Sequence, residues 1–201
     1  MAHQTTLPQL VRGEWIPMTY EEFLDWAEGM HAEWVDGEGI VFMPATDRHQ
    51  WVVGLLNELL ARFALLFDLG RVVQAPFQME FWPGGPHREP DVLFLANAHL
   101  DRWTETGIMG PADFAAEVIS DDSVDRDLVD KLRQYAQLGV PEYLAIDPRP
   151  GHERFALHRL DDDHQYRLVE SDEQGRYHFQ ALPGFWLNPG WFTKDPLPTA
   201  E

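Results

Sequence analysis

Three ionisable residues lie where the surrounding sequence predicts buried structure. Asp91 comes immediately before a short apolar run, and Glu117 interrupts another apolar run that is otherwise typical of a buried strand. Lys131 belongs to the apolar stripe of a predicted helix, whose members follow one another at spacings of four, three, four and three: Val124, Leu128, Lys131, Tyr135 and Leu138. A carboxylate or an ammonium in such surroundings requires a charged partner, a metal ion or a chemical role.

The two acids and the lysine have the composition of a metal-dependent hydrolytic site. If the strands that carry Asp91 and Glu117 are neighbours, both carboxylates reach one edge of the sheet. There they would hold Mg²⁺ or Mn²⁺ together with a backbone carbonyl, waters and a phosphate oxygen of the substrate. Such a cation lowers the pKa of a bound water and neutralises charge on a phosphoryl group. Lys131 would orient the attacking water or stabilise the transition state.

Structural explanations remain open for each of these residues. Asp91 can cap a turn, Glu117 can pair with an arginine, and Lys131 can extend its ammonium to water along the flank of its helix. Glu33 lies in a predicted hairpin strand and faces either the site or solvent. His49, in the first turn of a predicted helix, is either a polar surface residue or a catalytic one, and its role stays unassigned.

The composition narrows the possible function classes. With 44% hydrophobic and 24% charged residues, the chain of 201 residues is typical of a globular protein with a substantial core. The absence of cysteine excludes disulfides and thiol nucleophiles, and the lack of a signal-like N-terminus favours a cytoplasmic location. No apolar stretch approaches the roughly 18 residues of a membrane span. A net charge of −19 argues against a broad basic groove for nucleic acid, although a metal ion or an arginine cluster would still attract phosphate.

The hydrophobic pattern predicts an α/β fold. Helices are expected at 20–28, 48–68 and 124–138, and a hairpin at 31–43. Strands are expected at 71–74, 77–82, 92–95, 114–119 and 142–147, and a mixed loop with some helix at 96–113. An antiparallel meander is expected over 154–160, 165–170 and 177–180. Residues 1–17 are expected to be an irregular lead-in, residues 18–192 a single domain and residues 193–201 a tail.

The order of these motifs resembles that of the Uma2 family, within the PD-(D/E)XK nuclease superfamily. Pro90-Asp91 and Ala116-Glu117-Val118 resemble its two acidic motifs. Ile119 stands where the usual lysine would be, and Lys131 resembles a lysine supplied from the following helix. The turn Ser120-Asp121-Asp122-Ser123 departs from the family's usual Ser-Pro-Ser. The other resembling segments extend over about 18–192: Met18–Glu22, Glu33–Glu38, the helix with His49, Glu89–Val92, Asp127–Pro148 and Leu182–Phe185.

The resemblance implies a restriction-endonuclease-like fold, with a mixed central sheet flanked by helices and an additional antiparallel hairpin layer. It implies an active site of Glu33, Asp91, Glu117 and Lys131, with Mg²⁺ or Mn²⁺ on Asp91 and Glu117, that cleaves phosphodiester bonds of nucleic acid, possible substrates being DNA and RNA. Two alternatives stay open: a non-catalytic binding or assembly module, which the net charge favours, and hydrolysis of a small phosphodiester. Because the fold often pairs, a homodimer is a further expectation.

Overall fold

A six-stranded mixed sheet forms the centre of the molecule. A computed structural model describes residues 13–42, 45–121, 124 and 126–199, and its central sheet has the strand order β12-β11-β10-β9-β7-β4. Strands β9 and β10 are parallel, and every other neighbouring pair in this sheet is antiparallel. The strands are β4 (Gly70–Gln74), β7 (Val92–Ala96), β9 (Phe114–Val118), β10 (Glu142–Asp147), β11 (Arg154–Leu160) and β12 (Tyr166–Leu168).

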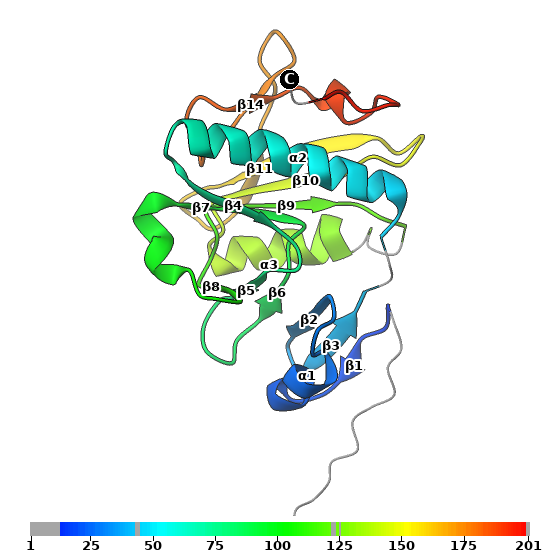
Figure 1. Ribbon diagram of the computed structural model, residues 1–201, viewed down its shortest axis with the longest axis vertical. Coiled ribbons are helices and arrows are strands. Elements are labelled where there is room, and N and C mark those ends of the chain that lie inside the picture. The colour runs from blue at the N-terminus through cyan, green and yellow to red at the C-terminus, as the bar shows by residue number, and fades with distance from the viewer. Residues whose placement is uncertain (1–12, 43–44, 122–123, 125, 200–201) are drawn as a thin grey trace, which may run out of the picture.

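Two helices cover the opposite faces of this sheet (Figure 1). The longer helix, α2 (Asp47–Leu66), starts at the N-cap Thr46, whose side chain accepts a hydrogen bond from the backbone of His49. The second, α3 (Lys131–Leu138), follows a π-helical turn, η2 (Arg126–Asp130), and ends at Gly139, whose φ of 83° suits glycine. The helices predicted at 48–68 and 124–138 are therefore present, and a π-turn opens the second one.

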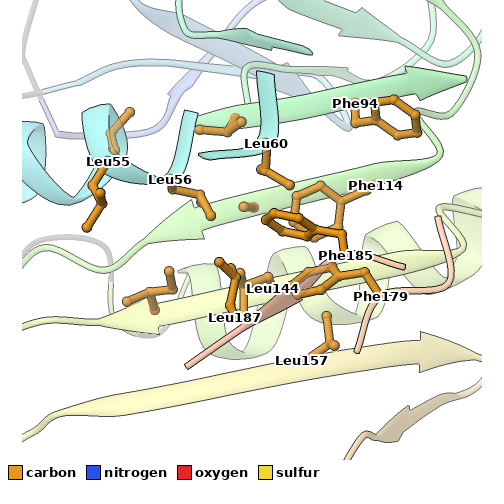
Figure 2. Packing of buried hydrophobic residues seen from close by; sticks show 14 of the residues in the cluster. Leu55, Leu56, Leu60, Phe94, Phe114, Leu144, Leu157, Phe179, Phe185 and Leu187 are labelled. Carbon is orange, nitrogen blue, oxygen red and sulfur yellow. The ribbon is translucent and has the colours of Figure 1, made fainter. Parts of the chain in front are cut away.

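The larger core lies between the central sheet and α2. Its buried residues alternate along β7 and β9, where Val92, Phe94, Phe114 and Ala116 face α2. Figure 2 shows Leu60 of α2 beside the ring of Phe114, and Phe179, Phe185 and Leu187 belong to the same cluster. The other face of the sheet packs against α3 through Leu93, Ala115 and Tyr143, among others. The odd-numbered residues of β7 and β9 therefore project toward α3.

The second six-stranded sheet supplies the predicted hairpin layer, on the α3 side of the molecule (Figure 1). Its order is β1-β3-β2-β6-β5-β8, antiparallel except for the β5–β8 pair. Helix α1 (Tyr20–Trp26) packs on it and begins with a capping box formed by Thr19 and Glu22. The strands are β1 (Ile16–Pro17), β2 (Ala32–Val35), β3 (Glu38–Val41), β5 (Gln78–Glu80), β6 (His87–Arg88) and β8 (Gly107–Met109).

The structure corrects the predicted C-terminal meander. Strands β11 and β12 pair as expected, but β13 (Tyr177–His178) pairs with β14 (Trp186–Leu187) in a separate two-stranded sheet. Just after β13, the backbone of Gln180 and Ala181 donates hydrogen bonds to the buried carboxylate of Glu142, which fixes this segment beside the start of β10. Because β14 comes later in the chain, the local sequence pattern of β13 does not predict that these two strands pair.

The remaining predicted segments differ in smaller ways. The loop at 96–113 contains the expected helix, the 3₁₀-helix η1 (Asn97–Arg102), and a second short 3₁₀-helix, η3 (Pro189–Trp191), follows β14. The expected irregular lead-in ends in β1, while its first twelve residues lie outside the described part of the chain, as do residues 122 and 123 of the turn after β9. Among the described residues, no helix has the length and apolar character needed to cross a membrane.

Candidate active site

Asp91 and Glu117 lie at the same end of two neighbouring strands of the central sheet. Strands β7 and β9 pair with Val92 opposite Ala116, which brings the preceding Asp91 and the following Glu117 level with each other. Glu117 shares the α3 side of the sheet with Ala115, two residues before it in β9. Asp91 immediately precedes β7 and contacts His49 at the start of α2.

The ammonium of Lys131 lies among three carboxylates. Its Nζ is 2.9 Å from Oε1 of Glu117, 3.0 Å from Oε1 of Glu33 and 3.4 Å from Oδ1 of Asp127. All four side chains are at most 4% exposed. The alternative in which this lysine extends into water is therefore wrong: its ammonium is buried inside an acidic cluster.

Helix geometry accounts for part of this arrangement. Asp127 precedes Lys131 by four residues, and the π-turn η2 carries it on the approach to α3. The backbone carbonyl of Asp127 accepts a hydrogen bond from the hydroxyl of Tyr143, at 2.7 Å, which ties the turn to β10. The hydroxyl of Tyr135, one turn after Lys131, donates to Oε1 of Glu117 at 2.8 Å. The ammonium of Lys131 and the hydroxyl of Tyr135, both on α3, thus contact the same carboxylate oxygen of Glu117.

Asp91 is held by a backbone amide and a histidine. Its Oδ2 accepts a hydrogen bond from the amide of Val118 at 2.7 Å and lies 3.3 Å from Nε2 of His49, at the start of α2. Burial alone would raise the pKa of Asp91, but the hydrogen bond and charge of His49, with the amide of Val118, lower it below its ordinary value. The structure thereby brings His49 to the acid pair, a role that the sequence left unassigned.

Glu33 reaches the site from the hairpin layer, and both of its oxygens are engaged. Oε1 lies 3.0 Å from the ammonium of Lys131 and accepts from the amide of Glu89 at 3.2 Å. Oε2 accepts from Nη1 of Arg88, whose side chain is 1% exposed. Glu33 therefore faces the site, and its contacts are those of a counter-ion for two buried cations.

The electrostatics keep Lys131 charged. Burial alone would lower the pKa of its ammonium, but Glu117, Glu33 and Asp127 raise that pKa above its ordinary value. The pKa of Glu117 is raised well above the usual glutamate range, mainly by burial and further by the nearby acids Asp127 and Asp91, against the opposing effect of Lys131. Lys131 is consequently a fixed positive charge, a group that orients and stabilises anions and does not accept a proton.

The donor set of Asp91 and Glu117 fits a hard divalent cation with several waters. Among the described residues, the hydrogen bonds and ion pairs of Asp91 end on Oδ2 and those of Glu117 on Oε1. One oxygen of each carboxylate is thus available for a metal ion. Within that same part of the chain, no group of three or more acidic or histidine side chains forms a metal cage. Two carboxylates completed by water and substrate are the arrangement that Mg²⁺ favours.

Sequence patterns did not single out three residues of this cluster: Arg88, Glu89 and Asp127. Arg88 ends the two-residue strand β6 and Glu89 follows it, and so short a strand shows no hydrophobic alternation that would mark these residues as buried. Asp127 has a weak signal, because it lies four residues before the buried Lys131 and such a spacing places two side chains on one helix face.

Comparisons with known proteins identify the family and the fold. A model of the Uma2 family, described as "Putative restriction endonuclease", matches residues 20–190. Among solved structures, the chain is similar to a protein from Anabaena variabilis, described as "a putative nuclease belonging to DUF820", with a TM-score of 0.71. The two are 14% identical, and the match covers 88% of this chain and 98% of the other, so it concerns the fold. No curated protein matches the chain.

Proposed function

Because the chain belongs to the Uma2 family of restriction-endonuclease-like proteins, we propose that it is a metal-dependent endonuclease that hydrolyses phosphodiester bonds of nucleic acid. One observation carries the proposal beyond the family assignment. The ammonium of Lys131 lies 2.9 Å from Glu117, and the pairing of β7 with β9 brings Glu117 to the same strand end as Asp91. An acid pair beside a fixed cation is the combination that phosphoryl transfer requires, since charge develops on the phosphate oxygens.

Asp91 and Glu117 would hold Mg²⁺ or Mn²⁺ through the oxygens that their protein contacts leave available. The ion would lower the pKa of a bound water and neutralise charge on the phosphate. His49 and the amide of Val118 keep Asp91 ionised and fixed. Lys131 orients the attacking water and stabilises the negative charge that builds up during the reaction, and Glu33 holds Lys131 in place.

The experiment measures cleavage of supercoiled plasmid, single-stranded DNA and RNA, with Mg²⁺, Mn²⁺ or a chelator. We expect metal-dependent cleavage by the wild type and none by Asp91→Asn. The matched control is Glu58→Gln, which changes a half-exposed carboxylate on α2, paired with Arg62 and outside the acidic cluster. Equal cleavage by wild type and Asp91→Asn, or cleavage that a chelator leaves unchanged, would contradict the proposal.

A binding or assembly module is the second candidate, and the net charge of −19 favours it. Such a charge opposes a long polyanion wherever basic side chains do not offset it. Titration calorimetry with Mn²⁺ separates the two candidates, since the endonuclease must bind the ion at Asp91 and the module need not. A small phosphodiester such as bis(p-nitrophenyl) phosphate tests the third candidate, because its cleavage needs no extended basic groove.

A further inference from the structure

Arg88 joins the hairpin layer to the helix that carries Lys131. It lies in β6, and its Nη1 donates to Oε2 of Glu33 in the neighbouring strand β2. Its Nη2 donates to Oε1 of Gln134, one turn beyond Lys131 on α3. The guanidinium therefore bridges the second sheet and helix α3, with one nitrogen bound to each.

The contacts of Glu33 extend this connection to the acidic cluster. While Oε2 of Glu33 binds Arg88, its Oε1 lies 3.0 Å from the ammonium of Lys131. The same ammonium is 2.9 Å from Glu117. An unbroken series of charged contacts thus leads from Arg88 through Glu33 and Lys131 to a carboxylate of the acid pair.

The burial of Arg88 indicates a role beyond stability. Its side chain is 1% exposed, and the ring of Trp15 lies 5.7 Å from the guanidinium carbon. Buried ion pairs are weak contributors to stability, because desolvation cancels most of their attraction and a well-packed apolar residue often does as well. Arginine differs from lysine in having a rigid planar fork that can bind two partners at fixed angles. The geometry at Arg88 uses that property, since its two terminal nitrogens go to two different structural layers.

We propose that Arg88 is a positioning residue: through Glu33 and Gln134 it holds the ammonium of Lys131 against Glu117. The catalytic consequence rests on the proposed nuclease function, while the positioning of Lys131 does not. Glu33 acts accordingly as an oriented counter-ion with both oxygens in use, and not as a ligand of the metal. Without Arg88, Oε2 of Glu33 loses this ion pair and the side chain is less firmly oriented, so that Lys131 is less confined to one place.

The chain offers a direct probe of the position of Lys131. It has only two lysines, Lys131 and Lys194, and Lys194 is exposed. Reaction of native protein with an amine reagent, followed by mass spectrometry of the peptides, gives the labelling rate of each lysine. Lys194 serves as the internal reference. In the wild type, Lys131 should be strongly protected, because it is 3% exposed and surrounded by carboxylates.

The test compares Arg88→Met and Arg88→Lys with the control Arg159→Met. Arg159 also pairs with a buried glutamate, Glu142, but at the other end of β10. We expect Arg88→Met to raise the labelling rate of Lys131 relative to Lys194 at least tenfold and to lower kcat more than it changes KM. Arg88→Lys, which reaches Glu33 or Gln134 but not both, should give an intermediate rate. Arg159→Met should leave the labelling rate of Lys131 relative to Lys194 unchanged, and also kcat and KM. This should hold even where it lowers stability as much as Arg88→Met does.

Each outcome decides one of the two proposals. If Arg88→Met leaves the Lys131 labelling ratio at the wild-type value, the positioning role is overturned, whatever happens to kcat. If the ratio rises but wild-type protein cleaves no substrate, the positioning role stands and the nuclease proposal fails. Should Arg88→Met not fold, Gln134→Leu removes only the contact with α3. A labelling ratio unchanged in that variant and in Arg88→Lys then overturns the inference.

Discussion

Two buried glutamates lie on neighbouring strands of the central sheet, at opposite ends of the pairing. Glu142 opens β10, opposite Phe114, and is 1% exposed, while Glu117 lies near the end of β9 and is 3% exposed. The carboxylate of Glu142 accepts hydrogen bonds from the backbone of Gln180 and Ala181 and from the guanidinium of Arg159. The contacts of Glu117 are the ammonium of Lys131 and a tyrosine hydroxyl, in the company of further acids.

The difference shows how to distinguish a structural carboxylate from a chemical one. At Glu142 the donors are fixed amides and one arginine, and together they occupy both oxygens and anchor the C-terminal segment. At Glu117 like charges have been gathered around a single ammonium, which raises the energy of the folded protein unless a positive ion compensates. Proteins tolerate such a concentration of charge mainly where a ligand or a reaction uses it.

The comparison predicts the largest effect for Glu117→Gln. This change keeps the shape of the side chain and the hydrogen bond with Tyr135 but removes the charge that a metal ion requires. Cleavage should fall by about 10³-fold or more, with thermal stability equal to or above that of the wild type. Plasmid cleavage and a thermal melt of the same sample measure both quantities. Retained cleavage would place Glu117 among the structural carboxylates.

The second prediction concerns Lys131→Met. In this variant Glu33, Glu117 and Asp127 would lose the cation that they share. The unfolding free energy should fall by about 3 kcal/mol. Millimolar Mn²⁺ should raise the unfolding free energy of the variant by more than it raises that of the wild type. Denaturant unfolding with and without Mn²⁺ checks this, and a variant as stable as wild type in chelator would contradict it.

Glu142→Gln should give the opposite pattern to Glu117→Gln. The NH₂ of the new glutamine side chain would face the backbone N–H donors that bind the carboxylate in the wild type. Arg159 would lose the anion with which it pairs. Stability should therefore decrease by about 2 kcal/mol, while kcat per folded molecule stays at the wild-type value. Denaturant unfolding and cleavage assays at low temperature separate these effects. A loss of kcat without a loss of stability would remove the distinction between the two glutamates.

The central part of the site could be predicted because its signals are local. Asp91, Glu117 and Lys131 each break an apolar pattern, and a strand–helix–strand unit brings such positions together. The α/β class and the long helices followed from the same periodicity. Local patterns therefore identified the acids and the ammonium before any coordinates were known.

The rest depends on contacts between distant segments. Arg88 is recognisable only once β6 lies beside β2 and α3, and His49 only once the start of α2 reaches the start of β7. The pairing of β13 with β14 depended in the same way on the long-range anchor at Glu142. Hydrophobic periodicity carries no information on which polar residues meet across layers.

The last prediction is a pH dependence at Glu89, which lies beside the acidic cluster and is 3% exposed. Burial and the nearby charge of Glu33 raise its pKa to about 8, from 4.5. Between these values the unfolded chain has lost the proton that the folded protein keeps, so stability should decrease as the pH rises. The slope from this group is at most about 1.4 kcal/mol per pH unit. Glu89→Gln cannot ionise, and its unfolding free energy should fall less than that of the wild type between pH 5 and 8. Parallel curves for the two proteins in denaturant titrations would show that Glu89 is ionised in the folded state.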